Sequence, residues 1–444
     1  MPFHTKPWVN DTLNQFAEQS LSQFDMSEHQ AMITSIYTLA EENRTIHEKQ
    51  CINLNPATNI MNPKAEALLA SGMGSRPSLG HPGDKYEMGL EAIEQIELVA
   101  AQLACEVFDA KYAEIRVASG AMANLYAFMA TCKAGDTVLV PPASIGGHVT
   151  HHNAGAAGLY GLNVVEMASD ATHYTVDLNA LRKQAHALKP KLITIGGSLN
   201  LLPHPIADIR AIADEVGAFV LFDAAHQCGI IAGKSWPNPL NEGAHVMTMS
   251  TYKSLGGPPG GLIVSNDATL MEKIDAIAFP GLTANFDAAK SAALSVSLLD
   301  WKAHGKAYSE AMISTNQALA VACQNQGLPV FQVDTPNGKL PTLSHQFAII
   351  AAPFGGGQAM AKKLRKANIL TCGIGLPIDP VSGDMNGLRF GTPEIVRAGF
   401  TAQDMPAVAS LIADCLLDRR EHKEIADSTE TLRRQYKGLH YVLS

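Results

Sequence analysis

The chain has 444 residues and a formal net charge of −9, and 46% of its residues are hydrophobic while only 17% are charged. This length predicts two domains. The small share of charged residues predicts an oligomer that buries surface between its subunits. The negative net charge excludes nucleic acid and anionic membranes as expected partners. The seven cysteines lack C-x-x-C spacing, which favours reduced thiols over disulfides. The N-terminus does not resemble a leader and no apolar run is long enough to span a membrane, so we expect a soluble cytoplasmic protein.

The spacing of apolar residues predicts helices first and then alternating helices and strands. Between residues 11 and 50 the helical spacing predicts an N-terminal arm. The elements expected next are a helix at 88–108, a strand at 113–117, a helix at 121–131, strands at 137–140 and 192–195, and a long helix at 288–324. Strands near Phe331, Phe347 and Leu388 and helices near Ala361 and Met405 then predict a smaller α+β region. We therefore expect a helical arm at 1–60, a large α/β domain at 61–310 and a small domain at 311–444.

One lysine lies between a predicted strand and a glycine-rich turn. Lys253 follows the run Met249–Tyr252 and precedes the residues 256–261, Gly-Gly-Pro-Pro-Gly-Gly. Apolar neighbours would bury the side chain, and a desolvated amine loses its proton more easily and becomes nucleophilic near neutral pH. Lys253 is therefore a candidate for Schiff-base chemistry, and an ordinary surface lysine is the alternative.

A carboxylate and an imidazole follow a second apolar run. Residues 217–222 favour a β-strand, and Asp223 and His226 come directly after it. Ligands of open α/β sheets bind at this end of the strands, where a buried carboxylate needs a cationic partner. A protonated pyridine nitrogen is such a partner, so Asp223 and Lys253 together predict a pyridoxal phosphate site. A helix cap or a structural ion pair is the alternative for Asp223.

Ser119, Gly120 and Ala121 follow the strand at 113–117 and open a helix. Backbone N–H groups, the Ser119 hydroxyl and the positive end of the helix converge there, and this arrangement suits a phosphate group. A serine is also a common helix N-cap, so from these residues alone both interpretations stay open.

Four segments together resemble the serine hydroxymethyltransferases, which are fold-type I pyridoxal phosphate enzymes. The segments are Asp223–His226, Ser250–Gly261, Phe279–Gly281 and Gly387–Pro393, and their order and spacing agree from about residue 50 to 415. The resemblance implies a central, mostly parallel, seven-stranded sheet and an amino acid as substrate. It also implies a homodimer or a dimer of dimers, with sites at the subunit interface and the arm packed on a partner.

The resemblance also implies roles for individual residues around the cofactor. His148 would stack on the ring, and Ser198 and His226 would lie near the phenolic oxygen. The phosphate would be held by Ser119, Gly120, Ala121, Ser250 and, from a second subunit, Gly281.

On the substrate side, the resemblance implies that Arg389 grips the carboxylate of the amino acid through two parallel hydrogen bonds, with a structural ion pair as the alternative. Tyr86 retains one of the family's paired tyrosines and is expected to contact the substrate. His151 and His152 are adjacent and point in different directions, so no metal site is expected.

The chain departs from the family pattern near the substrate. The family has a Lys-Tyr-Ala-Glu run before a Gly-Tyr-Pro-Gly turn, whereas this chain has Arg-Pro-Ser-Leu at 76–79 before the turn Gly80–Gly83. Leu79 cannot transfer the proton that the family's glutamate handles, so the use of tetrahydrofolate is uncertain. We expect His81 or Glu87 to take over the general acid/base work.

The sequence thus predicts an enzyme that breaks or makes the Cα–Cβ bond of a β-hydroxy amino acid such as serine or 2-methylserine. Lys253 would exchange its imine for the substrate's amine, Asp223 would keep the ring nitrogen protonated, and the ring would accept electrons as the bond breaks. A folate-independent aldolase of α-methylserine or threonine type, and an aminotransferase or decarboxylase on the same scaffold, remain alternatives. A protein that binds the cofactor without catalysis would have no need of Lys253, Asp223 and Arg389 together.

Overall fold

The computed structural model describes residues 4–444 and divides the chain into two compact units, Met1–Cys51 and Ile52–Ser444. The first unit contains α1 (Asp11–Leu21) and α2 (His29–Thr45), as the spacing of its apolar residues predicted. Asn10 caps α1, because its side chain accepts a hydrogen bond from the amide of Leu13 at 3.0 Å. The boundaries expected at residues 60 and 310 remain predictions.

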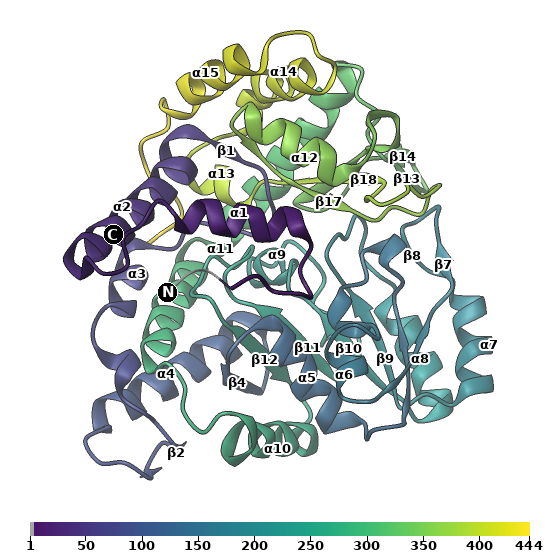
Figure 1. Cartoon of the computed structure of the whole chain (residues 1–444). Helices are drawn as coiled ribbons and strands as arrows, with labels where there is room; N and C mark the ends of the chain where they lie inside the picture. The colour runs from purple at the N-terminus through teal and green to yellow at the C-terminus, as the bar shows by residue number, and fades with distance from the viewer. Residues whose placement is uncertain (1–3) are drawn as a thin grey trace. The chain divides into compact units, whose positions relative to one another are not determined.

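A seven-stranded sheet forms the centre of the second unit. Its strands are β4 (Tyr112–Val117), β5 (Thr137–Val140), β6 (Asn163–Glu166), β9 (Leu192–Gly196), β10 (Phe219–Asp223), β11 (Val246–Ser250) and β12 (Gly261–Ser265). Their spatial order is β4-β12-β11-β10-β9-β5-β6, and Figure 1 shows the run from β4 to β9. All pairs are parallel except those of β12, which is antiparallel to β11 and β4. The expected mostly parallel sheet is confirmed.

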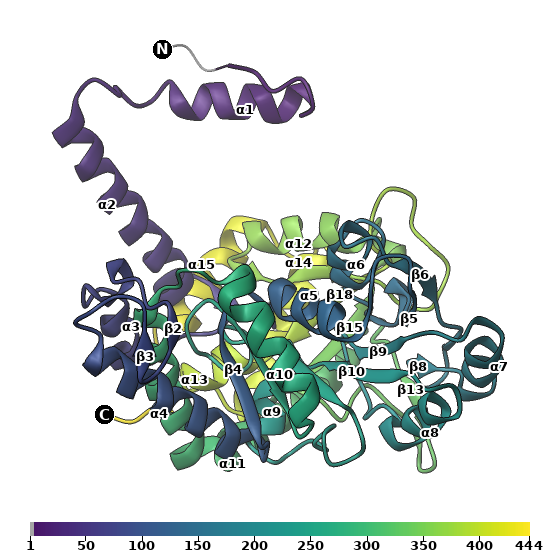
Figure 2. The same ribbon diagram turned by 90° about the horizontal axis from the view of Figure 1, so that it is seen from below.

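The central strands are apolar on both faces because helices cover both faces of the sheet. Within β10, Val220 and Phe222 belong to one hydrophobic cluster and Leu221 belongs to another. The helices of this part are α3 (Pro63–Leu69), α4 (Glu91–Phe108), α5 (Gly120–Thr131), α6 (Ala156–Leu159), α7 (Leu178–Leu188), α8 (Ile206–Val216), α9 (Cys228–Ala232) and α10 (Ala268–Ala276). Helix α10 contacts α5, as Figure 2 shows, and α8 contacts α7 and β10.

Helix α4 begins at Glu91 and not at Met88, where the sequence predicted its start. The reason is Gly89, whose φ of +83° is a left-handed conformation that an α-helix cannot contain. The strand expected near Phe331 is likewise displaced, to β13 (Val333–Thr335), which pairs with β14 (Gly338–Leu340).

A long helix, α11 (Ala288–Asn325), leads from the large sheet to a smaller one and runs through residue 310 without a break. Leu294 of α11 packs in the cluster of the large sheet, and Leu319 packs in the cluster of the small sheet. The small sheet has the order β15 (Gln346–Ile350), β18 (Gly387–Gly391), β17 (Cys372–Ile374), and all of its pairs are antiparallel. No helix in the described part of the chain is long and apolar enough to cross a membrane.

The remaining elements surround these two sheets. They are α12 (Gly357–Lys366), α13 (Pro393–Arg397), α14 (Met405–Leu416), α15 (His422–Arg433), and the strand pairs β1 (Ile52–Asn53) with β16 (Ile369–Leu370), β2 (Gly80–His81) with β3 (Asp84–Lys85), and β7 (Ser169–Asp170) with β8 (Thr175–Val176). Helix α12 contacts β17 and β18 and lies beside α14 (Figures 1 and 2).

Candidate active site

The predicted site residues lie where the parallel strands of the large sheet end. Asp223 is the last residue of β10, and Lys253 and Ser198 follow β11 and β9. Because parallel strands end at the same edge of a sheet, these side chains meet there. They enclose a cavity of about 140 Å³. The predicted residues that line the cavity are Ser119, Gly120, Ala121, His148, Ser198, Asp223, His226, Ser250 and Lys253.

Lys253 is buried, with 7% of its surface exposed, and it lies in the turn that follows β11. Burial lowers the pKa of its ammonium group to about 8; the charge of Asp223 opposes this effect and the charge of Arg389 adds to it. The Nζ atom lies 3.1 Å from Nε2 of His226. The turn folds back on itself, because the Thr251 hydroxyl donates to the carbonyl of Pro258 at 2.5 Å. Lys253 is therefore a desolvated amine on a constrained turn, and such an amine is a nucleophile near neutral pH.

Asp223 is buried and receives hydrogen bonds at both carboxylate oxygens. Its Oδ2 accepts from Nε2 of His151 and from Nδ2 of Asn124, each at 2.9 Å, and its Oδ1 accepts from the amide of Ala225 at 2.9 Å. Burial by itself would raise the pKa of this carboxyl, but the hydrogen bond and charge of His151, with further support from His148 and Asn124, hold its pKa well below the usual value. Asp223 is therefore ionised at every physiological pH.

The helix α5 begins at the wall of the cavity, where Ser119, Gly120 and Ala121 line it. Ser119 is its N-cap, and the Ser119 side chain accepts a hydrogen bond from the amide of Met122 at 3.2 Å. A Cβ atom at Gly120 would lie 2.1 Å from Oγ of Ser250, so only glycine allows the two segments to approach this closely. Two hydroxyls and the positive end of a helix thus meet at one place, which is suited to an anion.

His148 and His226 line the cavity on segments outside the sheet. Nδ1 of His148 lies 2.9 Å from the Thr150 hydroxyl and accepts from the Thr150 amide at 3.3 Å, so this ring is held by its own loop. Burial lowers the pKa of His148, the Asp223 charge raises it, and the Lys253 charge lowers it further. Burial and the charges of Lys253 and Arg389 place the pKa of His226 well below its usual value. Both imidazoles are therefore neutral near pH 7.

Arg389, on β18 of the small sheet, reaches the edge of the same site. Its Nη1 donates to the carbonyl of Ser198 and lies 3.3 Å from Nε2 of His226, and its Nη2 contacts the sulfur of Cys372 at 3.0 Å. Within residues 4–444, its buried Nε atom has no hydrogen-bond partner. A buried guanidinium with an unpaired N–H can donate this hydrogen bond to a carboxylate that enters the site.

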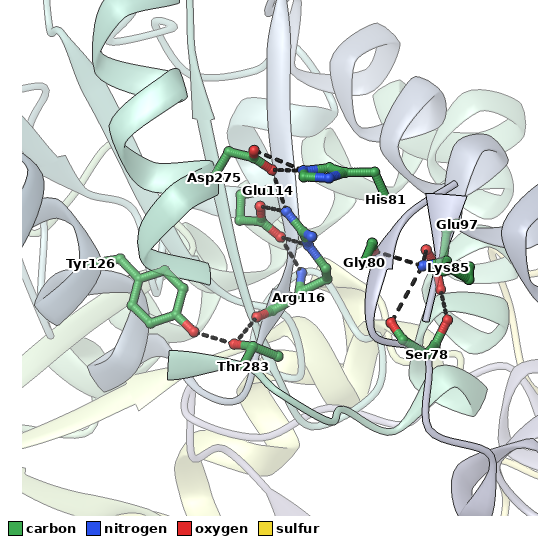
Figure 3. A network of polar contacts seen from close by, with 10 residues as sticks. All are labelled: Ser78, Gly80, His81, Lys85, Glu97, Glu114, Arg116, Tyr126, Asp275 and Thr283. Carbon is green, nitrogen blue, oxygen red and sulfur yellow. Dashed lines mark hydrogen bonds and ion pairs between the residues drawn. The ribbon is translucent and has the colours of Figure 1, made fainter. Parts of the chain in front are cut away.

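Arg389 itself is not among the residues that line the cavity, and neither are the predicted residues His81, Tyr86, Glu87 and Gly281. Figure 3 shows that the His81 ring points to Asp275 on α10, and its Nε2 lies 2.9 Å from that carboxylate, which also pairs with Arg116. Tyr86 is largely exposed. Gly281 lies in the turn Ile277–Leu282 that follows α10.

The turn that carries His81 is anchored by a buried ion pair. Lys85 donates to Glu97 at 2.6 Å, and both side chains are almost fully buried. Lys85 also donates to the carbonyls of Ser78 and Gly80, and the Ser78 hydroxyl donates to the other oxygen of Glu97 (Figure 3). The position of the segment 78–85 is therefore determined by contacts within this chain.

The sequence did not identify Asn124 and His151, which bind Asp223 directly. The Asn124 amide is oriented by Thr248, whose hydroxyl donates to Asn124 Oδ1 at 2.7 Å. Asn124 lies one helical turn after Gly120, so the periodicity of α5 places it on the same face of the helix as Gly120. Nothing in the sequence distinguishes His151, because the nearby His148 and His152 could equally well have been the histidine that contacts Asp223.

A family model for serine hydroxymethyltransferase matches residues 29–412 of the chain. The chain belongs to the serine hydroxymethyltransferase family. It is 57% identical over 439 residues to a protein of Ralstonia sp named alpha-methylserine aldolase, with 99% of both chains covered. It is 62% identical over 408 residues to a protein of the same name from Variovorax paradoxus, with 92% of this chain and 91% of that chain covered. With a serine hydroxymethyltransferase of Methanopyrus kandleri it shares 37% identity over 395 residues, with 88% and 91% covered.

This family has the fold of type I pyridoxal phosphate enzymes, and the cavity fits that cofactor. The ionised Asp223 supplies the charge that a protonated ring nitrogen requires, and Lys253 supplies a buried amine. Gly120 and Ser250 approach closely at the start of α5, where the phosphate of the cofactor would fit. The donor set therefore matches the three reactive parts of pyridoxal phosphate, namely the ring nitrogen, the aldehyde and the phosphate.

Proposed function

We propose that the chain is an aldolase that cleaves α-methylserine between Cα and Cβ, giving alanine and formaldehyde without tetrahydrofolate. The observation that carries this proposal is its markedly higher identity with proteins named alpha-methylserine aldolase than with those named serine hydroxymethyltransferase. Leu79 also supports it, since this residue stands where the family's glutamate serves folate chemistry and cannot transfer a proton.

In this proposal Lys253 holds the cofactor covalently and releases it to the amine of the substrate. Bound pyridoxal phosphate supplies a ring that accepts the electron pair of the breaking bond. Asp223 keeps a proton on the ring nitrogen, because its carboxylate is buried, hydrogen-bonded and ionised. Arg389 binds the carboxylate of the substrate and so fixes which substituent of Cα stands perpendicular to the ring.

The reaction also needs a group that takes the proton from the β-hydroxyl as formaldehyde leaves, and a proton must reach Cα to form alanine. We propose that His81 or Glu87 of a second subunit carries out these proton transfers. One oxygen of Glu87 is buried and lacks a hydrogen-bond partner among the described residues, which suits a group that exchanges protons. His81 is already oriented by Asp275 through Nε2.

We also propose a homodimer or a dimer of dimers in which subunits complete one another's sites. Apolar side chains of α1 and α2 are exposed, among them Phe16 and Ile36, as are Leu98 and Val99 of α4. Exposed apolar residues that are grouped on helices favour burial against another protein chain. Gly281 would then contribute to the phosphate site of a second subunit, as the resemblance to the family implies.

The proposed activity is tested by incubating the purified holoenzyme with α-methylserine, serine and threonine, each with and without tetrahydrofolate. We expect formaldehyde and alanine from α-methylserine at a rate that tetrahydrofolate does not change. Faster cleavage with tetrahydrofolate would contradict the proposal and favour a hydroxymethyltransferase. Release of a keto acid or of carbon dioxide would instead indicate an aminotransferase or a decarboxylase.

Arg389→Lys is expected to weaken the binding of α-methylserine by about one to two powers of ten. Lysine keeps the charge but loses the two-pronged geometry, and a hydrogen bond to a charged group contributes about 1.5–3 kcal/mol. The measurement is KM together with the spectroscopic affinity for α-methylserine, and Arg182→Lys, a surface residue on α7, is the matched control. An unchanged affinity would assign Arg389 to a structural role.

A further inference from the structure

The guanidinium of Arg389 is held at both ends of its fork. Nη1 donates to the carbonyl of Ser198, in the loop that follows β9 of the large sheet. Nη2 donates to the sulfur of Cys372 at 3.0 Å. Cys372 is the first residue of β17 and the cross-strand partner of Arg389 on β18. Directly paired residues of neighbouring strands point to the same face of a sheet, so the strand pairing places the thiol beside the guanidinium.

The thiol of Cys372 has a second partner, Asn55, in the segment that follows β1. The sulfur lies 3.5 Å from Oδ1 of Asn55. The same oxygen accepts a hydrogen bond from the backbone amide of Ala57 at 3.1 Å. A backbone N–H only donates, so the atom that faces Ala57 must be the oxygen of the Asn55 side chain and not its nitrogen. The segment after β1 therefore holds a hydrogen-bond acceptor beside the thiol.

These partners determine the direction of both hydrogen bonds of the thiol. A guanidinium only donates, so the sulfur accepts from Arg389. The Asn55 oxygen only accepts, so the thiol hydrogen points to Asn55. A thiol has one hydrogen to donate and lone pairs with which to accept, so Cys372 satisfies both neighbours at once. The buried Nε of Arg389, which has no partner within residues 4–444, is left to donate to a ligand.

We propose that Cys372 is a positioning residue that, supported by Asn55, holds Nη2 of Arg389 and so fixes the orientation in which this guanidinium binds the carboxylate of the substrate. The role of Arg389 in this proposal rests on the proposed function. Without a partner at Nη2, the guanidinium can pivot about its bond to Ser198, and its two-pronged grip is no longer aligned with a carboxylate. Cys372 acts through Arg389, since it is absent from the residues that line the cavity.

The test compares how the holoenzyme binds alanine and alaninol, in which a hydroxymethyl group replaces the carboxylate. Neither ligand has a β-hydroxyl, so both reach equilibrium, and each affinity is read from the visible spectrum of the cofactor. We expect Cys372→Ala to weaken the binding of alanine by about five- to tenfold, because it leaves a buried charged donor without its acceptor. The affinity for alaninol should stay unchanged, since alaninol has no carboxylate for Arg389 to bind.

Cys372→Ser is the conservative variant, because a hydroxyl accepts and donates hydrogen bonds as the thiol does. We expect it to bring the affinity for alanine back to within about twofold of that of the unmodified protein. In turnover of α-methylserine, Cys372→Ala should raise KM and leave kcat nearly unchanged, since Lys253 and Asp223 are untouched. The control is Cys105→Ala, which removes the other partly exposed thiol, on α4.

Equal losses of affinity for alanine and alaninol would assign Cys372 a merely structural role and overturn the proposal. An unchanged affinity for alanine in Cys372→Ala, or no recovery in Cys372→Ser, would also overturn it. The spectral measurements need no cleavage, so the two proposals can fail separately. If α-methylserine is not cleaved while Cys372→Ala weakens alanine alone, the substrate assignment fails and the role of Cys372 holds. If α-methylserine is cleaved while the affinity for alanine is unchanged, the role of Cys372 fails and the aldolase assignment holds.

Discussion

Lys253→Ala is expected to reduce the cleavage of α-methylserine to background. Lys253 is the only lysine among the described residues that line the cavity, and alanine offers no amine for covalent attachment of the cofactor. Reduction of the unmodified holoenzyme with borohydride, followed by peptide mapping, should place the cofactor on Lys253. Lys302→Ala, which breaks an exposed ion pair with Glu106 on the surface, is the control and should retain activity.

The pKa of Lys253 adds a pH dependence to the same experiment. The neutral amine is the nucleophile, and burial lowers the pKa of its ammonium form to about 8. The rate at which the apoenzyme attaches the cofactor should therefore rise with pH and level off above about pH 8. A label on another lysine, or a rate that still rises steeply up to pH 10, near the ordinary lysine pKa of about 10.4, would contradict this assignment.

Asp223→Asn is expected to lower turnover by about two to four powers of ten while the cofactor still binds. Asparagine keeps the size of the side chain but removes the charge that holds a proton on the ring nitrogen, and removing one partner of a buried ion pair costs about 3–5 kcal/mol. Turnover and cofactor occupancy are measured separately, by the release of formaldehyde and by the visible spectrum.

The control for this variant is Asp214→Asn, which removes a carboxylate from a surface pair with Arg210 and should leave turnover unchanged. Near-normal turnover of Asp223→Asn at full cofactor occupancy would show that the ring nitrogen needs no anionic partner. Loss of the cofactor would instead assign Asp223 mainly to binding.

Some features of this fold and site follow directly from local sequence. The buried strand β10 is apolar up to Phe222, β11 has three apolar residues among its five, and the turn after β11 is rich in glycine and proline, so these features are visible as patterns. Because parallel strands end at one edge of a sheet, the neighbourhood of Asp223 and Lys253 followed from the strands alone. Helix α4 was misplaced at its start only because the backbone angle of Gly89 cannot be read from apolar periodicity.

Other features were decided only when the chain folded. His151 and Asn124 reach Asp223 from 72 and 99 positions away, and Gln346 reaches Ser198 from 148 positions away. Local periodicity determines which residues form a helix or a strand, whereas these contacts depend on how separate elements pack against one another. The sequence by itself was therefore enough to predict the kind of cofactor, through Lys253 and the carboxylate at the end of a buried strand. The orientation of the groups around it was decided by tertiary packing, because a buried hydrogen bond has one geometry and its partners come from distant parts of the chain.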